Sequence, residues 1–243
     1  MIEFSDESER DRAWDILGGR DGGLFKREKD TKIQIKSGKE FEVIAEIIEN
    51  GNLPFSHTPV SEDVLRSDIE GISLRSYQER AWDKFVETGM IGVYWPPGTG
   101  KTFFSLYAGE RLRGEKLVVV PQKTLEEQWN ERIEEHCEHP EEWTVKTYQY
   151  LTHGSNMEEF KNLTLTIYDE SHRIPSRTYS KVATIDTEYR IGLTASPYRE
   201  EKNTTKYIFA LTGHPVGLDW EELVEIGVTN PPDVKVLLHR TLN

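Results

Sequence analysis

The sequence contains a single cysteine and lacks any long apolar run, and both shortages narrow the class of protein. Cys137 has no second cysteine with which to form an internal disulfide, which favours a reducing compartment. No apolar stretch is long enough to span a bilayer, and the acidic N-terminus has neither the basic nor the apolar region of a signal peptide. We therefore expect a soluble, intracellular protein, cytoplasmic in location and without a membrane partner.

Basic residues are also scarce. The 243 residues include 30 Lys and Arg against 43 Asp and Glu, so the formal net charge is −13. Affinity for phosphates comes from basic side chains, which argues against a protein that coats nucleic acid with its whole surface. A local contact surface for nucleic acid is still compatible with this charge.

One stretch, residues 91–102, carries the clearest chemical signal. An apolar strand is followed by a Pro/Gly turn and the start of a helix, which is the setting of a phosphate-binding loop. Gly98 and Gly100 let the backbone approach a ligand closely, and the N–H groups of the turn form a nest for an anion. Lys101 would contact the β and γ phosphates, and Thr102 would offer a hydroxyl to Mg²⁺. The loop residues predicted to bind the nucleotide are Pro97, Gly98, Thr99, Gly100, Lys101 and Thr102.

The loop departs from the strict pattern G-x-x-x-x-G-K-[ST], because Trp95 stands at the first glycine position. Taken alone, the stretch is also compatible with an ordinary turn between a strand and a helix. The motifs further along the chain favour the phosphate-binding interpretation.

Apolar strands and helical patterns alternate along the middle of the chain. Strands are expected at residues 117–120, 145–148, 163–168 and 189–193, and helices at 74–88, 102–113 and 123–139. This alternation predicts an α/β fold, a parallel sheet with helices on both faces. Ligands of such sheets bind at the carboxyl ends of the strands, so Lys101, Asp169 and Thr194 are expected to meet there. The apolar side of helix 102–113 is expected to consist of Phe103, Leu106 and Tyr107.

The two ends of the chain show other patterns. A short helix is expected at residues 5–17, a half-exposed strand at 31–36, a helix around 41–50 and a connector at 52–70. No residue in this part suggests chemistry, and we interpret residues 1–70 as a small α+β appendage. Beyond the last motif, a helix is expected at 218–226 and a strand at 234–238.

Asp169 and Glu170 directly follow the expected strand at residues 163–168. In an NTPase site, Asp169 would hold Mg²⁺ through water, and Glu170 would orient and activate the attacking water. The alternative is an acidic pair that caps the next helix. Because a phosphate-binding loop precedes the pair, we predict a catalytic set of Lys101, Asp169 and Glu170, with Thr102 and Asp169 as the Mg²⁺ ligands.

With these motifs in this order across residues 74–201, the chain resembles the first RecA-like lobe of a superfamily 2 DNA helicase, most closely of the XPB-like group. Arg75 and Gln78 lie in a stretch similar to the family's adenine-recognition motif. The resemblance also explains Trp95, because these helicases commonly lack the first glycine. The residues that it implies in coupling the nucleotide site to DNA and to lobe movement are His172, Thr194 and Ser196.

The resemblance further implies a DNA-binding side of the lobe. Residues 121–129 are similar to motif Ia and residues 147–148 to motif Ib, while residues 199–201 resemble a motif implicated in opening duplex DNA. The implied DNA contacts are Lys123, Thr124, Thr147 and Arg199. Solvated loop residues and an ordinary charged helix start are the alternatives. Two positions differ from the family: Ser171 replaces the more usual Val, Ala or Cys, and Glu201 replaces Asp.

The implied function is the ATP-binding half of a DNA-dependent ATPase, a helicase or translocase that uses ATP and Mg²⁺ to remodel or unwind DNA. Residues 71–230 would form the ATP-binding lobe, and residues 231–243 would begin the connection to a second RecA-like lobe of the same gene or a separate chain. Only about 45 residues follow the last motif, whereas a second lobe needs on the order of 150. We therefore expect the chain alone to be a weak ATPase. A repair or nuclease protein is a further expected partner.

Three other functions are compatible with parts of this pattern. The motor subunit of a restriction-type DNA translocase shares the same motifs. A non-motor module could use nucleotide only to gate the binding of DNA or protein. A small-molecule P-loop kinase fits less well, because it needs neither the upstream adenine motif nor the later Thr-Ala-Ser stretch. DNA-stimulated ATP turnover separates these functions.

Overall fold

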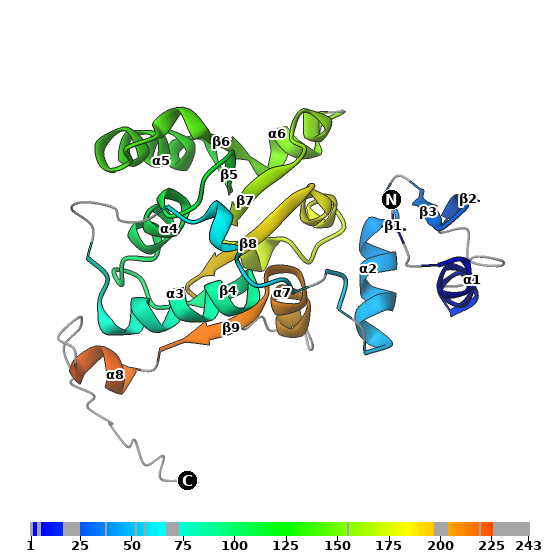
Figure 1. Ribbon diagram of the computed structural model, residues 1–243, viewed down its shortest axis with the longest axis horizontal. Helices are drawn as coiled ribbons and strands as arrows, with labels where there is room; N and C mark the ends of the chain where they lie inside the picture. Colours follow the sequence, from blue (N-terminus) through cyan, green and yellow to red (C-terminus); the bar gives the residue numbers. More distant parts are fainter. Residues whose placement is uncertain are drawn as a thin grey trace, which may run out of the picture.

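The main body of the protein is a six-stranded parallel sheet (Figure 1). The computed structural model describes residues 2–3, 6–16, 25–36, 38–51, 53–55, 57–66, 73–154, 156–196, 204–218 and 220–225. The strands are β4 (Met90–Tyr94), β5 (Lys116–Val120), β6 (Trp143–Thr147), β7 (Leu163–Tyr168), β8 (Thr187–Thr194) and β9 (His214–Gly217). Their order is β6-β5-β7-β8-β4-β9, and every neighbouring pair is parallel. The predicted α/β fold is confirmed.

Helices cover both faces of this sheet (Figure 1). Successive strand residues point to opposite faces, so Val118 and Val120 pack in one hydrophobic core while Leu117 and Val119 pack in the other. The first core is completed by α3 (Ser76–Thr88), α4 (Lys101–Glu110) and α5 (Lys123–His136). The second is completed by α2 (Glu40–Glu49), α6 (Tyr148–Thr152), α7 (Thr204–Thr212) and the 3-10 helix Ser180–Thr184.

Three details differ from the sequence-based expectations. The buried aromatic residue of α4 is Phe104, fully shielded from solvent, whereas Phe103 and Tyr107 are only half-buried. Helix α4 lies between α3, α5 and the sheet, so contacts on several sides decide which ring is buried. Tyr148 begins α6 instead of ending a strand. Helix α7 and strand β9 were not expected, since β9 has only four residues and contains Pro215, which an edge strand tolerates.

The N-terminal residues form a small antiparallel sheet that shares a helix with the main body. Its strands β1 (Ile2–Glu3), β3 (Lys32–Ile35) and β2 (Phe25–Lys29) lie in that order, with α1 (Glu7–Ile16) close by. In α2, Val43 packs in the core of this small sheet, and Ile44 packs in the second core of the main body. Glu49 at the end of α2 forms a 2.7 Å ion pair with Lys206 of α7. Helices α1 and α2 begin and end within two residues of the predicted bounds, 5–17 and about 41–50.

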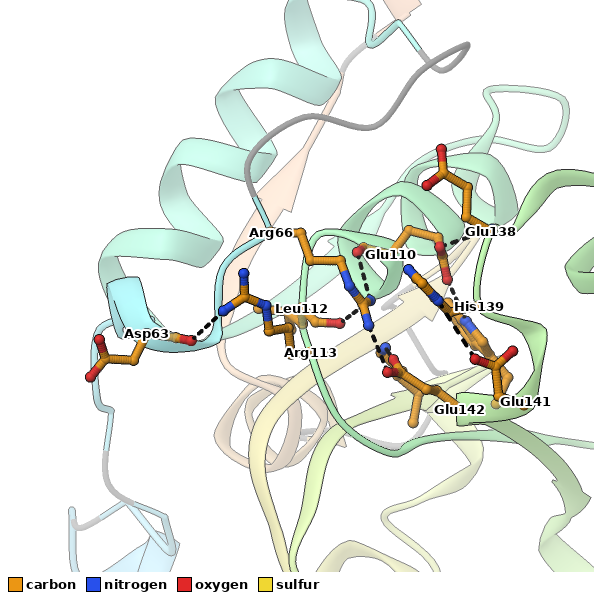
Figure 2. A network of polar contacts seen from close by, with 11 residues as sticks. Asp63, Arg66, Glu110, Leu112, Arg113, Glu138, His139, Glu141 and Glu142 are labelled. Carbon is orange, nitrogen blue, oxygen red and sulfur yellow. Dashed lines mark hydrogen bonds and ion pairs between the residues drawn. The ribbon is translucent and has the colours of Figure 1, made fainter.

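The expected connector packs against the main body through buried charges (Figure 2). The Arg66 guanidinium donates to Glu142 at 2.6 Å and to the main-chain carbonyl of Leu112 at 2.8 Å. Lys116, whose side chain is fully buried, also pairs with Glu142. Glu110 accepts hydrogen bonds from the Trp143 indole at 2.8 Å and from a main-chain N–H at 3.0 Å. We call the side chains of Arg66, Glu110, Lys116 and Glu142 the charged clasp.

The charged clasp lies at the amino ends of β5 and β6, because Lys116 and Trp143 are the first residues of those strands. The same connector places Val60 in the first hydrophobic core and contains the 3-10 helix Glu62–Val64. Helix α8 (Trp220–Glu225) falls in the expected range 218–226, whereas Arg199, the strand at 234–238 and the connection at 231–243 lie outside the described residues. The division of the chain into domains at residues 70 and 230 stays a prediction.

Candidate nucleotide site

The predicted phosphate-binding loop joins β4 to α4, at the carboxyl end of its strand. Gly98 and Gly100 both have φ of 79°, in the left-handed region that favours glycine. A Cβ atom at Gly98 would have no heavy atom within 4 Å, whereas one at Gly100 would lie 3.0 Å from the Gln78 amide nitrogen. The loop is therefore open toward a ligand at Gly98 and tightly packed against α3 at Gly100.

The Trp95 side chain supports this loop from the core side, between α3 and α4. This side chain is fully buried, with ring centroids 5.0 Å from Tyr77 and 5.4 Å from Phe104. The Tyr77 hydroxyl donates to the carbonyl of Thr99 at 2.6 Å. Because the indole turns into the core, it does not fill the space in front of the loop. This explains how tryptophan can replace the first glycine of the strict pattern.

Lys101 is held by the loop itself. Its Nζ donates to the carbonyls of Trp95 at 2.8 Å and Pro96 at 3.1 Å. Burial lowers the pKa of the Lys101 ammonium, and the nearby Glu170 and Asp169 partly oppose this shift. Main-chain carbonyls are neutral acceptors, so a phosphate would be a stronger partner for this ammonium.

The two carboxylates after β7 have opposite environments. Asp169 accepts hydrogen bonds from the Trp129 indole and from the main-chain N–H of Glu170, both at 3.0 Å, while burial raises its pKa. The hydrogen bond from His172 lowers the pKa of Glu170. Glu170 also adopts the left-handed conformation (φ 50°, ψ 49°), which is uncommon for a residue other than glycine and occurs at functional sites. Neighbouring carboxyl groups with pKa values pushed apart are typical of groups with different chemical roles.

His172 connects β7 to β8 through side chains. Its Nδ1 lies 3.2 Å from the Glu170 carboxylate and 3.1 Å from the Thr194 hydroxyl. The Thr194 hydroxyl in turn donates to the carbonyl of Ser196 at 3.0 Å and accepts from the Ser196 N–H at 3.2 Å. The expectation that the side chains following β4, β7 and β8 meet at one sheet edge is confirmed.

Gln78 is tied to the protein at both ends of its amide. Its Oε1 accepts from the Arg75 N–H at 2.9 Å, and its Nε2 donates to the Gly100 carbonyl at 3.3 Å. Only 3% of the residue is exposed, so the amide links α3 to the phosphate-binding loop. Contact of Arg75 and Gln78 with adenine stays a prediction.

Two site residues on α5 were missed in the sequence. Arg132 and His136 line a cleft of about 390 Å³ together with Gly98, Lys101 and Thr102 of the loop and its helix. The many Glu residues of α5 favour a solvated face, so the sequence pattern gives no reason to place Arg132 and His136 in a site. Their spacing from Trp129 was the available signal, because positions three and seven residues after Trp129 lie on the same side of a helix.

For the residues implied in DNA contact, the structure gives exposure and local hydrogen bonds. Lys123 and Thr124 are exposed at the start of α5. Thr147 is nearly buried, and its hydroxyl accepts the N–H of Tyr150 at 3.1 Å and so caps α6. Their contact with DNA stays a prediction.

The site suits a cation that depends on ligands from a bound phosphate. Within the described ranges, no three His, Cys, Asp or Glu side chains are grouped to hold a metal ion. Magnesium is usually bound by one or two protein side chains together with substrate phosphates and water. Thr102, at the start of α4, and Asp169, at the end of β7, fit that donor set.

A parallel sheet with a phosphate-binding loop after one strand and an Asp-Glu pair after another defines a RecA-like P-loop NTPase lobe. Residues 71–162 match the family model described as type III restriction enzyme, res subunit. The chain is 31% identical over 192 residues to the protein named "Putative DNA 3'-5' helicase Rad25" of Haloarcula marismortui. It is 33% identical over 174 residues to the "DNA 3'-5' translocase XPB2" of Sulfurisphaera tokodaii.

These alignments cover 72% and 67% of this chain, but only 31% and 37% of the relatives. The chain thus spans about a third of the length of the curated relatives it matches. The alignments to these relatives confirm the predicted resemblance to the XPB-like group of superfamily 2 DNA helicases.

Two solved helicase structures share the fold. The Hef helicase domain of Pyrococcus furiosus matches with a TM-score of 0.52 and 24% identity over 64% of this chain and 40% of that one. The UvsW helicase of bacteriophage T4 matches with a TM-score of 0.50 and 15% identity, over 73% of this chain and 77% of that one. Among the helices of the described residues, none has the length and apolar character needed to cross a membrane.

Proposed function

We propose that this chain is the ATP-binding lobe of a DNA-dependent ATPase that works as a helicase or translocase. One observation carries the proposal: Lys101, Asp169 and Glu170 share the carboxyl edge of the sheet, and His172 bridges Glu170 to Thr194. The bridge offers a physical route by which a change at the nucleotide could reach the end of the neighbouring strand.

The roles of the residues follow from their positions. The N–H groups of the loop and Lys101 would bind the phosphates of ATP, while Thr102 and Asp169 would hold Mg²⁺. When bound, magnesium neutralises charge on the phosphates. Glu170 has a lowered pKa and is ionised at neutral pH, so it can accept the proton of an attacking water. In the tautomer with its proton on Nδ1, His172 would orient that carboxylate.

DNA and a second RecA-like lobe are the proposed partners, with a repair or nuclease protein as a further one. The named relatives are a DNA helicase and a DNA translocase, which supports DNA as the substrate. An arginine finger from another lobe or protein contributes about 10³ to 10⁵ in rate in such NTPases. We therefore expect residues 1–243 alone to bind ATP and to hydrolyse it slowly.

ATP turnover with and without DNA tests this proposal. It should be measured for this chain and for a version joined to its second lobe, beside the variant Lys101→Ala. We expect DNA to stimulate the joined protein and Lys101→Ala to abolish nucleotide binding while the apo protein melts at an unchanged temperature. An unchanged affinity for ATP in Lys101→Ala would contradict the assignment of the loop.

A restriction-type translocase is the second candidate, favoured by the match of residues 71–162 to the res subunit model. A helicase separates the strands of a duplex, whereas a translocase can displace a third strand without separating the duplex. An assay of strand separation and an assay of third-strand displacement, both on the protein joined to its second lobe, distinguish a helicase from a translocase. A module that is merely gated by nucleotide would change its DNA affinity with ATP and show no DNA-stimulated turnover.

A further inference from the structure

A second cleft lies beside the nucleotide site, and the lining residues that the structure describes all carry potential hydrogen-bond donors. Its volume is about 340 Å³, and its lining residues are His172, Arg173, Ser176, Thr178 and Tyr179. Each of these side chains carries an N–H or O–H group, and none of the lining residues that the structure describes is a carboxylate. The Glu170 carboxylate lies close to two of these residues, because it is 3.2 Å from the His172 Nδ1 and interacts with the charge of Arg173. It is not among the described lining residues, whose donors suit an anion.

The sequence around this cleft has an unusual charge for this protein. Residues 171–185 contain Arg173, Arg177 and Lys181 but neither Asp nor Glu, although the whole chain has a net charge of −13. By contrast, residues 126–142 on and after α5 contain eight Glu and a single Arg. The basic stretch is therefore a local surface of the kind that an acidic protein needs in order to bind a polyanion.

The cleft is built on rigid structure. Ile174, Val182 and Ala183, on either side of the lining residues, are fully buried in the second hydrophobic core. Within the cleft segment, the N–H of Tyr179 donates to the Ser176 hydroxyl at 3.2 Å. The main chain that carries the donors is consequently anchored to the core before any ligand arrives.

Two of these donors are available to a ligand. Among the residues that the structure describes, no hydrogen bond or ion pair engages the Arg173 guanidinium or the Thr178 hydroxyl, and both residues are exposed. Arg177 differs, because it does not line the cleft and lies near Glu42 of α2. The pKa of Glu42 is lowered mainly by a hydrogen bond from its own backbone, and Lys39 and Arg177 add to that shift.

The cleft also contacts the catalytic edge. His172 lines the cleft, and its Nδ1 lies 3.2 Å from the Glu170 carboxylate. The ring of Tyr179 packs 5.3 Å from that of Tyr148, whose hydroxyl donates to the main-chain carbonyl of Asp169 at 3.0 Å. An anion in the cleft would therefore lie one side chain from the Glu170 carboxylate and two side chains from the main chain of Asp169.

We propose that this cleft binds a backbone phosphate of DNA, with the Arg173 guanidinium and the Thr178 hydroxyl as its main donors. This inference rests on the proposed function, since the donors would suit an acidic or phosphorylated peptide as well. DNA is favoured because the cleft adjoins the Glu170–His172–Thr194 bridge and the relatives act on DNA by name. The contact would be to the phosphate and independent of base sequence.

The test is the affinity of the chain 1–243 for a fluorescent DNA duplex, measured by anisotropy at several salt concentrations. Arg173→Gln should weaken binding about tenfold, the effect of one charged hydrogen bond. It should also reduce the slope of log K against log salt by about 0.9, because one phosphate contact is lost. Thr178→Val should weaken binding about threefold and leave the slope unchanged, since the hydroxyl is neutral.

Arg177→Gln is the matched control, because it removes the same charge from the same stretch outside the cleft. If Arg177→Gln lowers affinity and slope as much as Arg173→Gln, general charge explains the binding and the cleft proposal is wrong. If wild-type chain binds DNA and Arg173→Gln binds equally well, the cleft proposal alone fails. If wild-type chain does not bind DNA and the joined protein shows no DNA-stimulated turnover, the proposed function fails as well.

A polyglutamate peptide separates DNA from an acidic protein partner. We expect it to compete poorly with DNA for wild-type chain at equal charge concentration. The opposite result would be that Arg173→Gln weakens the binding of polyglutamate but not that of DNA. It would assign the cleft to an acidic partner and overturn the proposal.

Discussion

The two edges of the central sheet hold their charged side chains in different ways. At the amino edge, Arg66 and Lys116 of the charged clasp both form ion pairs with Glu142. At the carboxyl edge, the hydrogen bonds that the structure describes for the Lys101 ammonium go to neutral main-chain carbonyls, with the charges of Glu170 and Asp169 nearby. The Glu170 backbone there adopts a left-handed conformation. Ionic partners within the protein make the first edge a fixed structure. Weaker partners at the second edge can be exchanged for a ligand.

The largest expected effect is on turnover at the carboxyl edge. In the protein joined to its second lobe, Glu170→Gln should reduce the rate of ATP hydrolysis by about 10² to 10⁴, because the amide cannot accept a proton. Binding of ATP with Mg²⁺ should be retained, since the amide preserves the shape of the carboxylate. Steady-state turnover beside nucleotide titration measures both quantities. Hydrolysis at the wild-type rate would show that Glu170 is not the base.

The support of the phosphate-binding loop gives the next largest effect. Trp95→Gly restores the glycine of the strict pattern but removes an indole that is fully buried between α3 and α4. We expect a loss of about 3 to 5 kcal/mol in the free energy of unfolding, as for other large-to-small changes in a core. Chemical denaturation measures this loss. A variant as stable as the wild type would mean that the indole does not support the loop.

At the amino edge, Lys116→Met tests the charged clasp. The change leaves Glu142 with Arg66 as its remaining cationic partner and 24% of its side chain exposed. We expect the free energy of unfolding to fall by about 3 kcal/mol, the lower end for breaking a buried pair. The affinity for nucleotide should not change, because the clasp lies at the opposite edge.

Lys161→Met is the matched control for this change, since Lys161 is exposed. It should alter the free energy of unfolding by no more than about 0.5 kcal/mol. Equal effects of the two substitutions would show that burial of Lys116 does not decide the outcome.

The smallest expected effects concern pH and have opposite signs for Asp169 and Glu170, the two carboxyl groups that follow β7. Burial raises the pKa of Asp169 above 3.8, so Asp169→Asn should stabilise the fold at neutral pH, and this gain should vanish as the pH falls below 3.8. The hydrogen bond from His172 lowers the pKa of Glu170 below 4.5, so Glu170→Gln should destabilise the fold at neutral pH. That loss should disappear as the pH falls from 4.5 through the lowered pKa.

Denaturant unfolding at a series of pH values checks both signs. Shifts of the same sign for Asp169→Asn and Glu170→Gln would contradict the opposite environments that we assign to them. Opposite signs would sharpen the comparison of the two edges, because the ionised Asp169 would then be held in the fold at a cost in stability.

Much of the carboxyl edge of the sheet could be predicted from short stretches of sequence. The loop needs glycines at positions with positive φ, and a parallel strand buried on both faces is a continuous apolar run such as residues 117–120. Polar residues directly after such strands lie at one edge whatever the rest of the fold. The positions of Lys101, Asp169 and Thr194 were predictable for this reason.

Side-chain partners far apart in the chain could not be predicted in this way. The sequence by itself determined the parallel sheet and the set of chemical groups at its carboxyl edge, because those depend on local patterns. Only the tertiary structure decided that Phe104 is buried more deeply than Phe103, that Arg132 faces the loop and that Arg66 closes the clasp. Each of these depends on which helix or strand packs against the residue, and periodicity along one element carries no information about its neighbour.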